Sequence, residues 1–394
     1  MVYLIALLVA PILFLTSFFV LEILVGLGRN VRVLGRGVRG SADEVRARNV
    51  IVVPAHDEEN IIGKTIARLK VEAEGVAEIL IVADNCSDGT ARAARDGGVE
   101  VIERHDEARR GKGFALAFAQ IHLAKNPRAV VIVLDADCFI DKASLELLTA
   151  TAQKYGRPCQ AVNLLRPSRG TPLVAMSSFA FMLKNLVRQR GLQRLAGSVH
   201  LTGTGMALPW ELFDHDRLAT SSIVEDVKLG IELTNAGKGP VLVAGATVWS
   251  DSSSSTGTLI QRKRWEGGTI ALALEVAPKF LRRALARRDP RALCRALDLC
   301  VPPVALLALL NLAVLGTAAI LTIATSAPWW PVLLQSAALA AVGIAVLIAW
   351  WREGRDFISF GQLACLPFYI FWKLPLYLGM RRQGSRVWLR PGRK

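Results

Sequence analysis

The sequence lacks the cysteine spacing of a zinc site or of a disulfide-rich domain. It has six cysteines in 394 residues, and no two of them stand as close together as zinc-ligand pairs do. We interpret all six as free thiols of a protein in a reducing compartment. They are Cys86, Cys138, Cys159, Cys294, Cys300 and Cys365.

A recognisable nucleic-acid-binding module is also absent, although the chain is strongly basic. The formal net charge is +15, but Lys and Arg cluster beside apolar segments, at residues 29–39, 282–295 and 381–394. Basic residues in these positions fit cytoplasmic loops and anionic lipid headgroups. We therefore predict that the chain contacts membrane lipids and does not bind nucleic acid.

Apolar residues, by contrast, are abundant. They make up 52% of the chain, and the mean hydropathy is +0.36, which favours a soluble domain joined to membrane segments. Residues 1–28 predict a first transmembrane helix, and residues 301–350 predict two more. The basic cluster follows the first helix instead of preceding it, which argues against a cleaved signal peptide.

The order of these segments predicts a multi-pass protein of the inner (plasma) membrane with a large cytoplasmic domain. A basic linker at residues 29–48 lies on the cytoplasmic side, and residues 271–300 have the pattern of amphipathic interfacial helices. Residues 351–394 end in a basic tail. We therefore prefer a re-entrant or interfacial segment there, while a fourth span stays open.

Between the membrane segments, strand and helix patterns alternate. Apolar runs predict strands at residues 50–53, 78–83, 99–102 and 130–134. Strands separated by helices in this way predict βαβ units and a parallel sheet. Asp57, Asp84 and Asp135 stand where strands end, at the edge where open α/β sheets bind ligands.

The motif Asp135-Ala136-Asp137 places two carboxylates at the end of an apolar strand. Hard divalent cations such as Mg²⁺ bind carboxylate oxygens and often share them with substrate phosphates. The motif therefore favours a metal–diphosphate site. The alternative is a capped strand end, because Asp is common in turns.

Several motifs in order resemble those of family 2 glycosyltransferases. Four of them lie at residues 53–59, 83–90, 110–113 and 135–137. Downstream, Glu225-Asp226 and the stretch from Gln261 to Trp265 resemble the E-D and Q-x-x-R-W motifs of the cellulose, chitin and hyaluronan synthase-like branch. The resemblance covers residues 49–270. It implies an α/β cytoplasmic domain with the GT-A fold, a Rossmann-like mixed sheet with flanking helices, joined to α-helical transmembrane segments.

The resemblance also implies a role for each motif residue. Asp226 matches the base that takes the proton of the acceptor hydroxyl, and Asp135 and Asp137 match the ligands of Mg²⁺ or Mn²⁺. The implied donor-binding residues are Pro54, Asp57, Asp84, Arg110, Lys112, Asp135 and Arg264. The implied acceptor-binding residues are Gly203, Thr204, Gly205, Glu225, Gln261 and Trp265.

Each assignment has a structural alternative that the residues leave open. Near the strand ends, these are a turn at Asp84 and solvated charges at Arg110 and Lys112. In the later motifs, they are a helix start at Glu225-Asp226 and a basic membrane-surface helix at 261–265. Residues 203–205 are either an acceptor loop or a plain turn. Residues 250–257 are either a gating loop or a linker.

Taken together, the motifs imply an inverting enzyme that moves a sugar from a nucleotide sugar, most simply a UDP-sugar. The acceptor is a lipid-linked or growing polysaccharide in bacterial exopolysaccharide or glycolipid synthesis, with other polysaccharide assembly or export proteins as partners. The alternatives are a catalytically idle scaffold of such an assembly and a sugar-nucleotide nucleotidyltransferase. The latter needs neither membrane spans nor a Q-x-x-R-W motif. The sugar, its linkage and processivity are left open.

Overall fold

The computed structural model describes residues 1–28, 49–167, 171–251 and 255–380, except for the side chains of residues 255–264 and 380. The chain divides into two compact units, which we describe separately. The helical unit comprises residues 1–29, 167–196 and 252–394, and the sheet unit comprises residues 30–166 and 197–251. Each unit therefore draws on more than one part of the chain.

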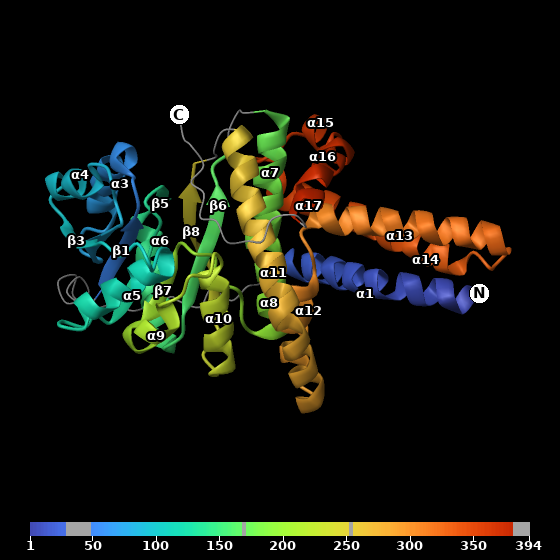
Figure 1. Cartoon of the computed structure of the whole chain (residues 1–394), viewed down its shortest axis with the longest axis horizontal. Coiled ribbons are helices and arrows are strands. Elements are labelled where there is room, and N and C mark those ends of the chain that lie inside the picture. Colours follow the sequence, from blue (N-terminus) through green and yellow to red (C-terminus); the bar gives the residue numbers. More distant parts are fainter. Residues whose placement is uncertain (29–48, 168–170, 252–254, 381–394) are drawn as a thin grey trace. The chain divides into compact units, whose positions relative to one another are not determined.

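The sheet unit is built on one eight-stranded mixed sheet with the strand order β3-β2-β1-β4-β7-β6-β8-β5 (Figure 1). β3, β2, β1 and β4 pair in parallel, as the alternating pattern predicted, whereas β7 runs antiparallel to β4 and β6, and β5 antiparallel to β8. The strands are β1 (Asn49–Ala55), β2 (Glu78–Asp84), β3 (Glu100–Arg104), β4 (Val130–Val133), β5 (Cys138–Ile140), β6 (Cys159–Leu165), β7 (Met206–Pro209) and β8 (Val241–Ser250). The predicted α/β mixed sheet is confirmed.

Helices cover both faces of this sheet, which explains why its central strands are apolar throughout. Ile51 and Val53 of β1 pack on one face in a core with α3 and α6, and Val50 and Val52 pack on the other face with α5 and α10. The helices of this unit are α3 (Glu59–Glu72), α4 (Thr90–Asp96), α5 (Lys112–Leu123), α6 (Lys142–Tyr155), the 3₁₀ helix η2 (Trp210–Leu212), α9 (His215–Leu218) and α10 (Glu225–Asn235). Successive side chains of a strand thus enter different cores.

The helical unit collects helices from three separate parts of the chain. The pattern at residues 174–195 predicts one helix, and the structure has α7 and α8 there, joined by a π-helical segment. The elements are α1 (Val2–Gly26), α7 (Pro172–Met182), η1 (Leu183–Arg188), α8 (Gln189–Ala196), α11 (Ser255–Arg287), α12 (Pro290–Cys300), α13 (Val304–Thr325), α14 (Trp330–Ala349), η3 (Trp350–Gly354), α15 (Phe360–Leu363), α16 (Leu366–Trp372) and α17 (Leu374–Met380).

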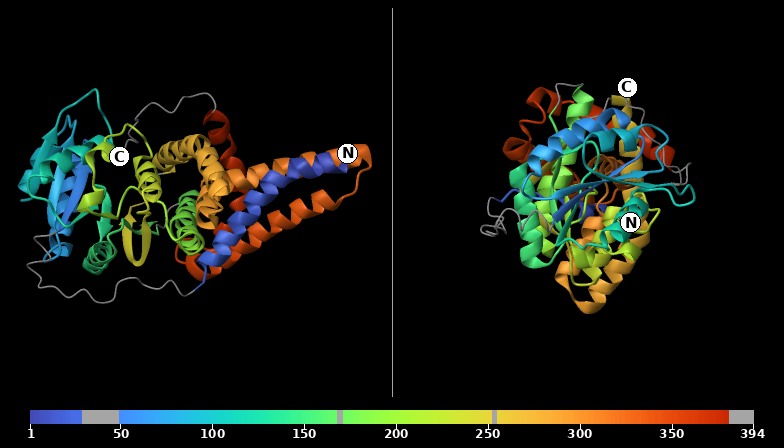
Figure 2. Two further views of the ribbon diagram at one scale, coloured as in Figure 1. Left: turned by 90° about the horizontal axis from the view of Figure 1, so that it is seen from below. Right: turned by 90° about the vertical axis from the view of Figure 1, so that its left-hand side faces the viewer.

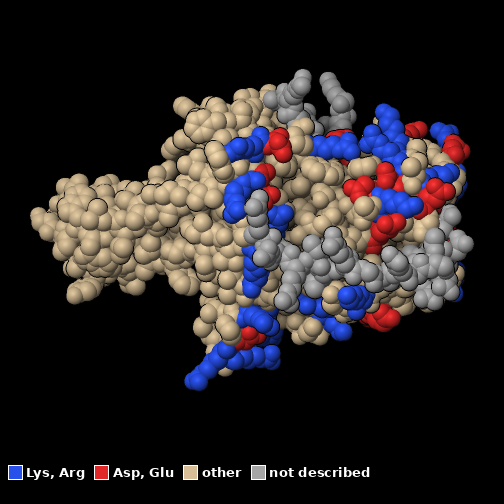
Figure 3. Space-filling model, turned by 180° about the vertical axis from the view of Figure 1, so that it is seen from behind, with Lys and Arg blue, Asp and Glu red and all other residues tan. Residues whose placement is uncertain are grey.

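Three helices of the described chain are long and apolar enough to cross a membrane: Val2–Gly26, Val304–Thr325 and Trp330–Gly354. α1, α13 and α14 lie side by side in Figures 1 and 2. α13 and α14 contain no charged residue, and the single charge of α1, Glu22, is buried. Their surface in Figure 3 is accordingly a wide band without Lys, Arg, Asp or Glu.

Polar contacts join these apolar helices at two levels. Asn311 of α13 donates to the hydroxyl of Thr16 on α1 at 2.9 Å and accepts from Gln335 of α14 at 2.6 Å. Arg188 of η1 pairs with Glu22 of α1 at 2.9 Å and with Asp298 of α12 at 2.6 Å. Hydrogen bonds and ion pairs between polar side chains thus connect α1 with α13 and η1, η1 with α12, and α13 with α14.

Candidate active site

Lys112 lies at the centre of a polar group on the sheet unit. It begins α5, and its Nζ donates to Oδ1 of Asp135, which follows β4, and to the backbone carbonyl of Gly203 at 2.6 Å. The backbone N–H of Asp135 in turn donates to the Thr204 hydroxyl at 3.1 Å. The start of α5, the end of β4 and the loop at residues 203–204 are far apart in the sequence and meet at one place.

A fourth segment, the start of α10 with Asp226, reaches this group beside Gly203. The Gly203 backbone has φ +81°, and a Cβ there would lie 3.3 Å from Oδ2 of Asp226 and 3.6 Å from Nζ of Lys112. Any side chain would thus be strained and would crowd the carboxylate. Glycine lets the loop pass directly beside Asp226, which stands in the first turn of α10.

The charges in this group act strongly on one another. Burial lowers the pKa of Lys112, but the carboxylates of Asp135 and Glu225 outweigh it and raise the pKa above its ordinary value. Burial and the neighbouring charge of Asp226 raise the pKa of Glu225 to about 8. The group therefore holds a charged lysine and, at neutral pH, a mostly protonated Glu225 beside Asp226.

Asp135 and Asp137 form a cluster with Cys138, and their ligand atoms all lie within 4.8 Å of one another. The Cys138 thiol donates to Oδ1 of Asp137 at 3.5 Å, and burial, followed by the Asp137 charge, raises the pKa of this thiol. The two carboxylates supply the oxygen donors of this cluster. This set fits Mg²⁺ or Mn²⁺.

Asp84, at the end of β2, is held in a buried ion pair. Its side chain is 9% exposed, and its Oδ1 accepts from Arg104 at 2.6 Å and from Asn85 at 3.0 Å. Arg104 also donates to the carbonyl of Arg109 at 2.7 Å and pairs with Asp106 at 3.1 Å. Arg104 thus holds both Asp84 and the loop that leads to Lys112, although no sequence motif marks it.

The other expected donor residues of the sheet unit lie at the end of β1 and on the turns that follow β1 and β3. Pro54 is half-buried in β1, and Asp57 has φ 52° and accepts from the backbone of Ser87 at 2.7 Å. Arg110 is exposed and pairs with Glu107 at 3.4 Å. Gly205, the last residue of the acceptor loop, has φ +64°, and a Cβ there would lie 2.6 Å from Val248.

The Q-x-x-R-W residues lie on α11, in the helical unit. The structure describes the backbone of Gln261 and Arg264, which is helical, but not their side chains. Trp265 is half-buried and stacks on Phe181 of α7, with ring centroids 5.8 Å apart. The next residue, Glu266, pairs with Lys373 and accepts from the Tyr377 hydroxyl at 2.8 Å. Residues 252–254, within the expected gating loop, are outside the described residues.

Comparison with protein families gives one match. A family model described as "Glycosyltransferase like family 2" matches residues 47–268, which include every site residue named above up to Glu266. A search of curated proteins gave no match.

Solved structures give further matches. The mannosyltransferase PcManGT from Pyrobaculum calidifontis, in complex with GDP-Man and Mn²⁺, is 17% identical with a TM-score of 0.53. The match covers 98% of this chain and 96% of that chain. Glucosyl-3-phosphoglycerate synthase from Mycobacterium tuberculosis, in complex with Mn²⁺ and UDP, is also 17% identical, with a TM-score of 0.36 and coverage of 58% and 86%. The first of these shows a shared fold.

Proposed function

The chain belongs to the glycosyltransferase-like family 2, and from this we propose that it is an inverting, membrane-bound enzyme that uses a nucleotide sugar. One observation carries the proposal. Lys112, Asp135, Gly203 and Asp226 come from four segments and meet at the carboxyl ends of the parallel strands. That edge is where open α/β sheets bind ligands.

The donor diphosphate needs positive charge and oxygen ligands for a cation. Asp135 and Asp137 would hold Mg²⁺ or Mn²⁺, which when bound offsets the charge on the departing nucleoside diphosphate. Lys112 supplies a fixed ammonium beside Asp135, suited to a phosphate oxygen. Pro54, Asp57, Asp84, Arg110 and Arg264 complete the proposed donor site.

Asp226 is the proposed base. It takes the proton of the acceptor hydroxyl, the acceptor oxygen forms a bond to the anomeric carbon, and the bond from that carbon to the diphosphate oxygen breaks with its electron pair. An α-linked donor thus gives a β-linked product. Glu225, protonated near neutral pH, adds no second negative charge beside the base. Gly203, Thr204, Gly205, Gln261 and Trp265 are the other proposed acceptor contacts.

The substrates follow from the chemistry and from the apolar helices. We propose a UDP-sugar donor and a lipid-linked or polysaccharide acceptor, in bacterial exopolysaccharide or glycolipid synthesis on the cytoplasmic side of the plasma membrane. Kinship with the cellulose, chitin and hyaluronan synthase-like branch is part of this proposal. It is supported by Asp226 beside Gly203 and by the position of the Q-x-x-R-W stretch on α11. Other polysaccharide assembly or export proteins are the proposed partners.

The test is nucleotide release by the purified full chain in nanodiscs. UDP- and GDP-sugars are offered with Mg²⁺ or Mn²⁺ and a polyprenyl-phosphate-linked acceptor. We expect release from one donor, and we expect Asp226→Asn to lower kcat by about 10²- to 10⁴-fold with donor binding kept. Asp137→Ala is expected to weaken metal and donor binding instead.

Asp216→Asn, an exposed Asp on α9, is the matched control and should match wild type. Full activity of Asp226→Asn would overturn the assignment of the base. No turnover of any donor, with equal UDP binding by wild type and Asp137→Ala, would favour the idle scaffold. Release of pyrophosphate in place of UDP or GDP would indicate a nucleotidyltransferase.

A further inference from the structure

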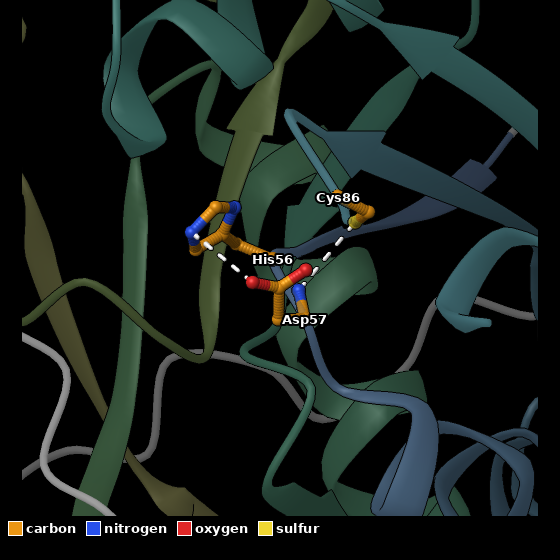
Figure 4. A group of neighbouring side chains, drawn as sticks. All are labelled: His56, Asp57 and Cys86. Atoms are coloured by element: carbon orange, nitrogen blue, oxygen red, sulfur yellow. Dashed lines mark hydrogen bonds and ion pairs between the residues drawn. The ribbon is translucent and has the colours of Figure 1, made fainter. Parts of the chain in front are cut away.

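A second group of metal-ligating side chains lies on the turns after β1 and β2 (Figure 4). His56 and Asp57 follow β1, and Cys86 follows β2, so these residues are distant in sequence and adjacent in space. One ligand atom from each of the three lies within 4.8 Å of the other two. All three side chains are partly exposed, so an ion can reach them from solvent.

The imidazole of His56 is held in the orientation that metal-binding histidines adopt. Its Nδ1 lies 2.8 Å from the backbone carbonyl of Asp84. A carbonyl only accepts, so Nδ1 carries the proton and Nε2 is the basic nitrogen. Nε2 lies 3.8 Å from Oδ2 of Asp57. A histidine that ligates a metal commonly donates its other ring N–H to a carbonyl or carboxylate in this way.

Asp57 and Cys86 are positioned by the same two turns. The backbone N–H of Ser87 donates to Oδ1 of Asp57 at 2.7 Å, and the Ser87 hydroxyl lies 3.2 Å from both Oδ1 and Oδ2, so Ser87 holds the Asp57 carboxylate beside His56. The backbone N–H of Asp57 lies 3.5 Å from Sγ of Cys86. Asp57 keeps a left-handed backbone with φ 52°, a strained conformation that is often found at binding sites.

We propose that His56, Asp57 and Cys86 form a second cation site, selective for a borderline-soft divalent ion such as Zn²⁺. Nitrogen, oxygen and sulfur donors together suit Zn²⁺, whereas Mg²⁺ and Mn²⁺ prefer the oxygen ligands at Asp135 and Asp137. Ligand atoms around tetrahedral Zn²⁺ lie about 3.3–3.8 Å apart, which small side-chain rotations would reach. On binding, the Cys86 thiol gives its proton to solvent. Three protein ligands leave one position of the metal open.

This site has a consequence that rests on the proposed function. Asp57 is also a proposed donor contact, so an ion that binds its carboxylate competes with the nucleotide sugar. Micromolar Zn²⁺ is then an inhibitor that raises the KM for the donor at saturating Mg²⁺. This inhibition is a separate measurement from metal binding, which needs no turnover.

The direct test uses Co²⁺ as a spectroscopic probe for Zn²⁺. The full chain in detergent is freed of metal with a chelator and titrated with Co²⁺ in excess Mg²⁺. We expect one equivalent to bind with a thiolate-to-cobalt charge-transfer band, and Zn²⁺ to displace it. Cys86→Ser should abolish the band, and His56→Gln should weaken Zn²⁺ binding at least 100-fold.

The matched control is Cys138→Ser, which changes the thiol beside Asp135 and Asp137. It should keep the band. Loss of the band in Cys138→Ser, or its survival in Cys86→Ser and His56→Gln, would overturn the proposal. A measurement on the unmutated chain guards against a variant that fails to fold: Zn²⁺ should protect Cys86 from alkylation, as read by mass spectrometry, and should leave exposed Cys365 reactive. If Zn²⁺ changes the alkylation of neither Cys86 nor Cys365, the proposed site would also be overturned.

Discussion

At the scale of single residues, the pair of Asp84 and Arg104 explains most about how the edge of the sheet is held. Each side chain is 9% exposed, and their contact is 2.6 Å. Two charges removed from water stabilise a fold only while they satisfy each other. The pair therefore fixes the end of β2, and the further bonds of Arg104 fix the segment before Lys112.

We expect Arg104→Met to lower the free energy of unfolding by about 3–5 kcal/mol, because it leaves Asp84 buried without its partner. Chemical unfolding of the full chain in detergent measures this change. The control is Arg95→Met, whose ion pair with Glu103 is largely exposed and should contribute about 1 kcal/mol or less. Equal losses in the two variants would contradict a structural role for the Asp84 pair.

A pH dependence follows from Glu225. Its pKa is raised from an ordinary 4.5 to about 8 in the folded protein, so across this range the folded chain holds a proton that the unfolded chain has lost. Stability therefore falls as the pH rises through the range. Below pH 4.5 we expect Glu225→Gln and wild type to have the same melting temperature. Between pH 4.5 and about 8, the melting temperature of Glu225→Gln should exceed that of wild type by a margin that grows with pH.

Thermal unfolding at a series of pH values, without added metal or donor, measures this margin. Glu232→Gln on the same helix is the matched control. A constant difference between Glu225→Gln and wild type at all pH values would show that the gain does not come from a proton.

At the residue scale, the family motifs marked Lys112, Asp135, Gly203 and Asp226, and the structure brings these four residues together. Their roles in binding and catalysis stay predictions. Arg104 was not marked, because a lone Arg at a strand end has no pattern that identifies its partner 20 residues away. The same holds for His56 and Cys86, which approach only because β1 and β2 are neighbours in the sheet.

At the scale of elements, α1 and α8 make the closest backbone approach that we describe. A Cβ on Gly26 of α1 would lie 2.0 Å from the carbonyl oxygen of Val187. One on Gly191 of α8 would lie 2.1 Å from that of Glu22. The two glycines therefore let the helix backbones touch, as small residues do between membrane helices.

We expect Gly191→Ala to lower the melting temperature of the full chain in detergent, because a backbone contact must move apart at a cost of about 1–3 kcal/mol. Gly316→Ala on α13 is the control, since a Cβ there meets nothing within 4 Å. Alanine in that helix should be neutral or slightly stabilising. A loss of stability in Gly316→Ala as large as in Gly191→Ala would refute the close-contact explanation.

Element prediction was accurate where pairing is local and incomplete where it is not. The alternation of strands and helices predicted β1 to β4, and one helix links each of the pairs β1–β2 and β2–β3. β4 pairs with β1, about 80 residues earlier in the chain, and no local pattern encodes that pairing. The other four strands, β7, β6, β8 and β5, come from residues 138–250 and pair in an order that no local pattern encodes. β6 and β8 pair in parallel, whereas β7 and β5 run antiparallel to their neighbours. Likewise, the 3.6-residue period cannot show that residues 183–188 form a π-helical turn.

At the scale of the whole molecule, the chain passes repeatedly between its two units. The chain leaves the sheet unit after residue 166 and forms α7, η1 and α8 in the helical unit. It enters the sheet unit again at residue 197. In the helical unit these elements contact α1, α11 and α12. The sheet unit is thus not one continuous piece of chain.

We therefore expect a fragment of residues 49–251 to aggregate when expressed alone. It contains α7 to α8 without α1, α11 or α12, so the apolar side chains of Phe179, Met182 and Val187 lose the helices that bury them. Size-exclusion chromatography of this fragment, beside the full chain in detergent, measures the outcome. A monodisperse fragment with cooperative unfolding would contradict the division of the chain into these units.

The ion pair between Glu22 and Arg188 joins two residues that the ribosome adds at different times. The two residues are 166 positions apart, and ribosomes add about 5–20 residues each second. The first helix therefore waits roughly 8–33 s for the arginine that its buried carboxylate needs. During that interval Glu22 has to be accommodated by water, lipid headgroups or the insertion machinery, so the ion pair of α1 is completed well after the helix itself has been made.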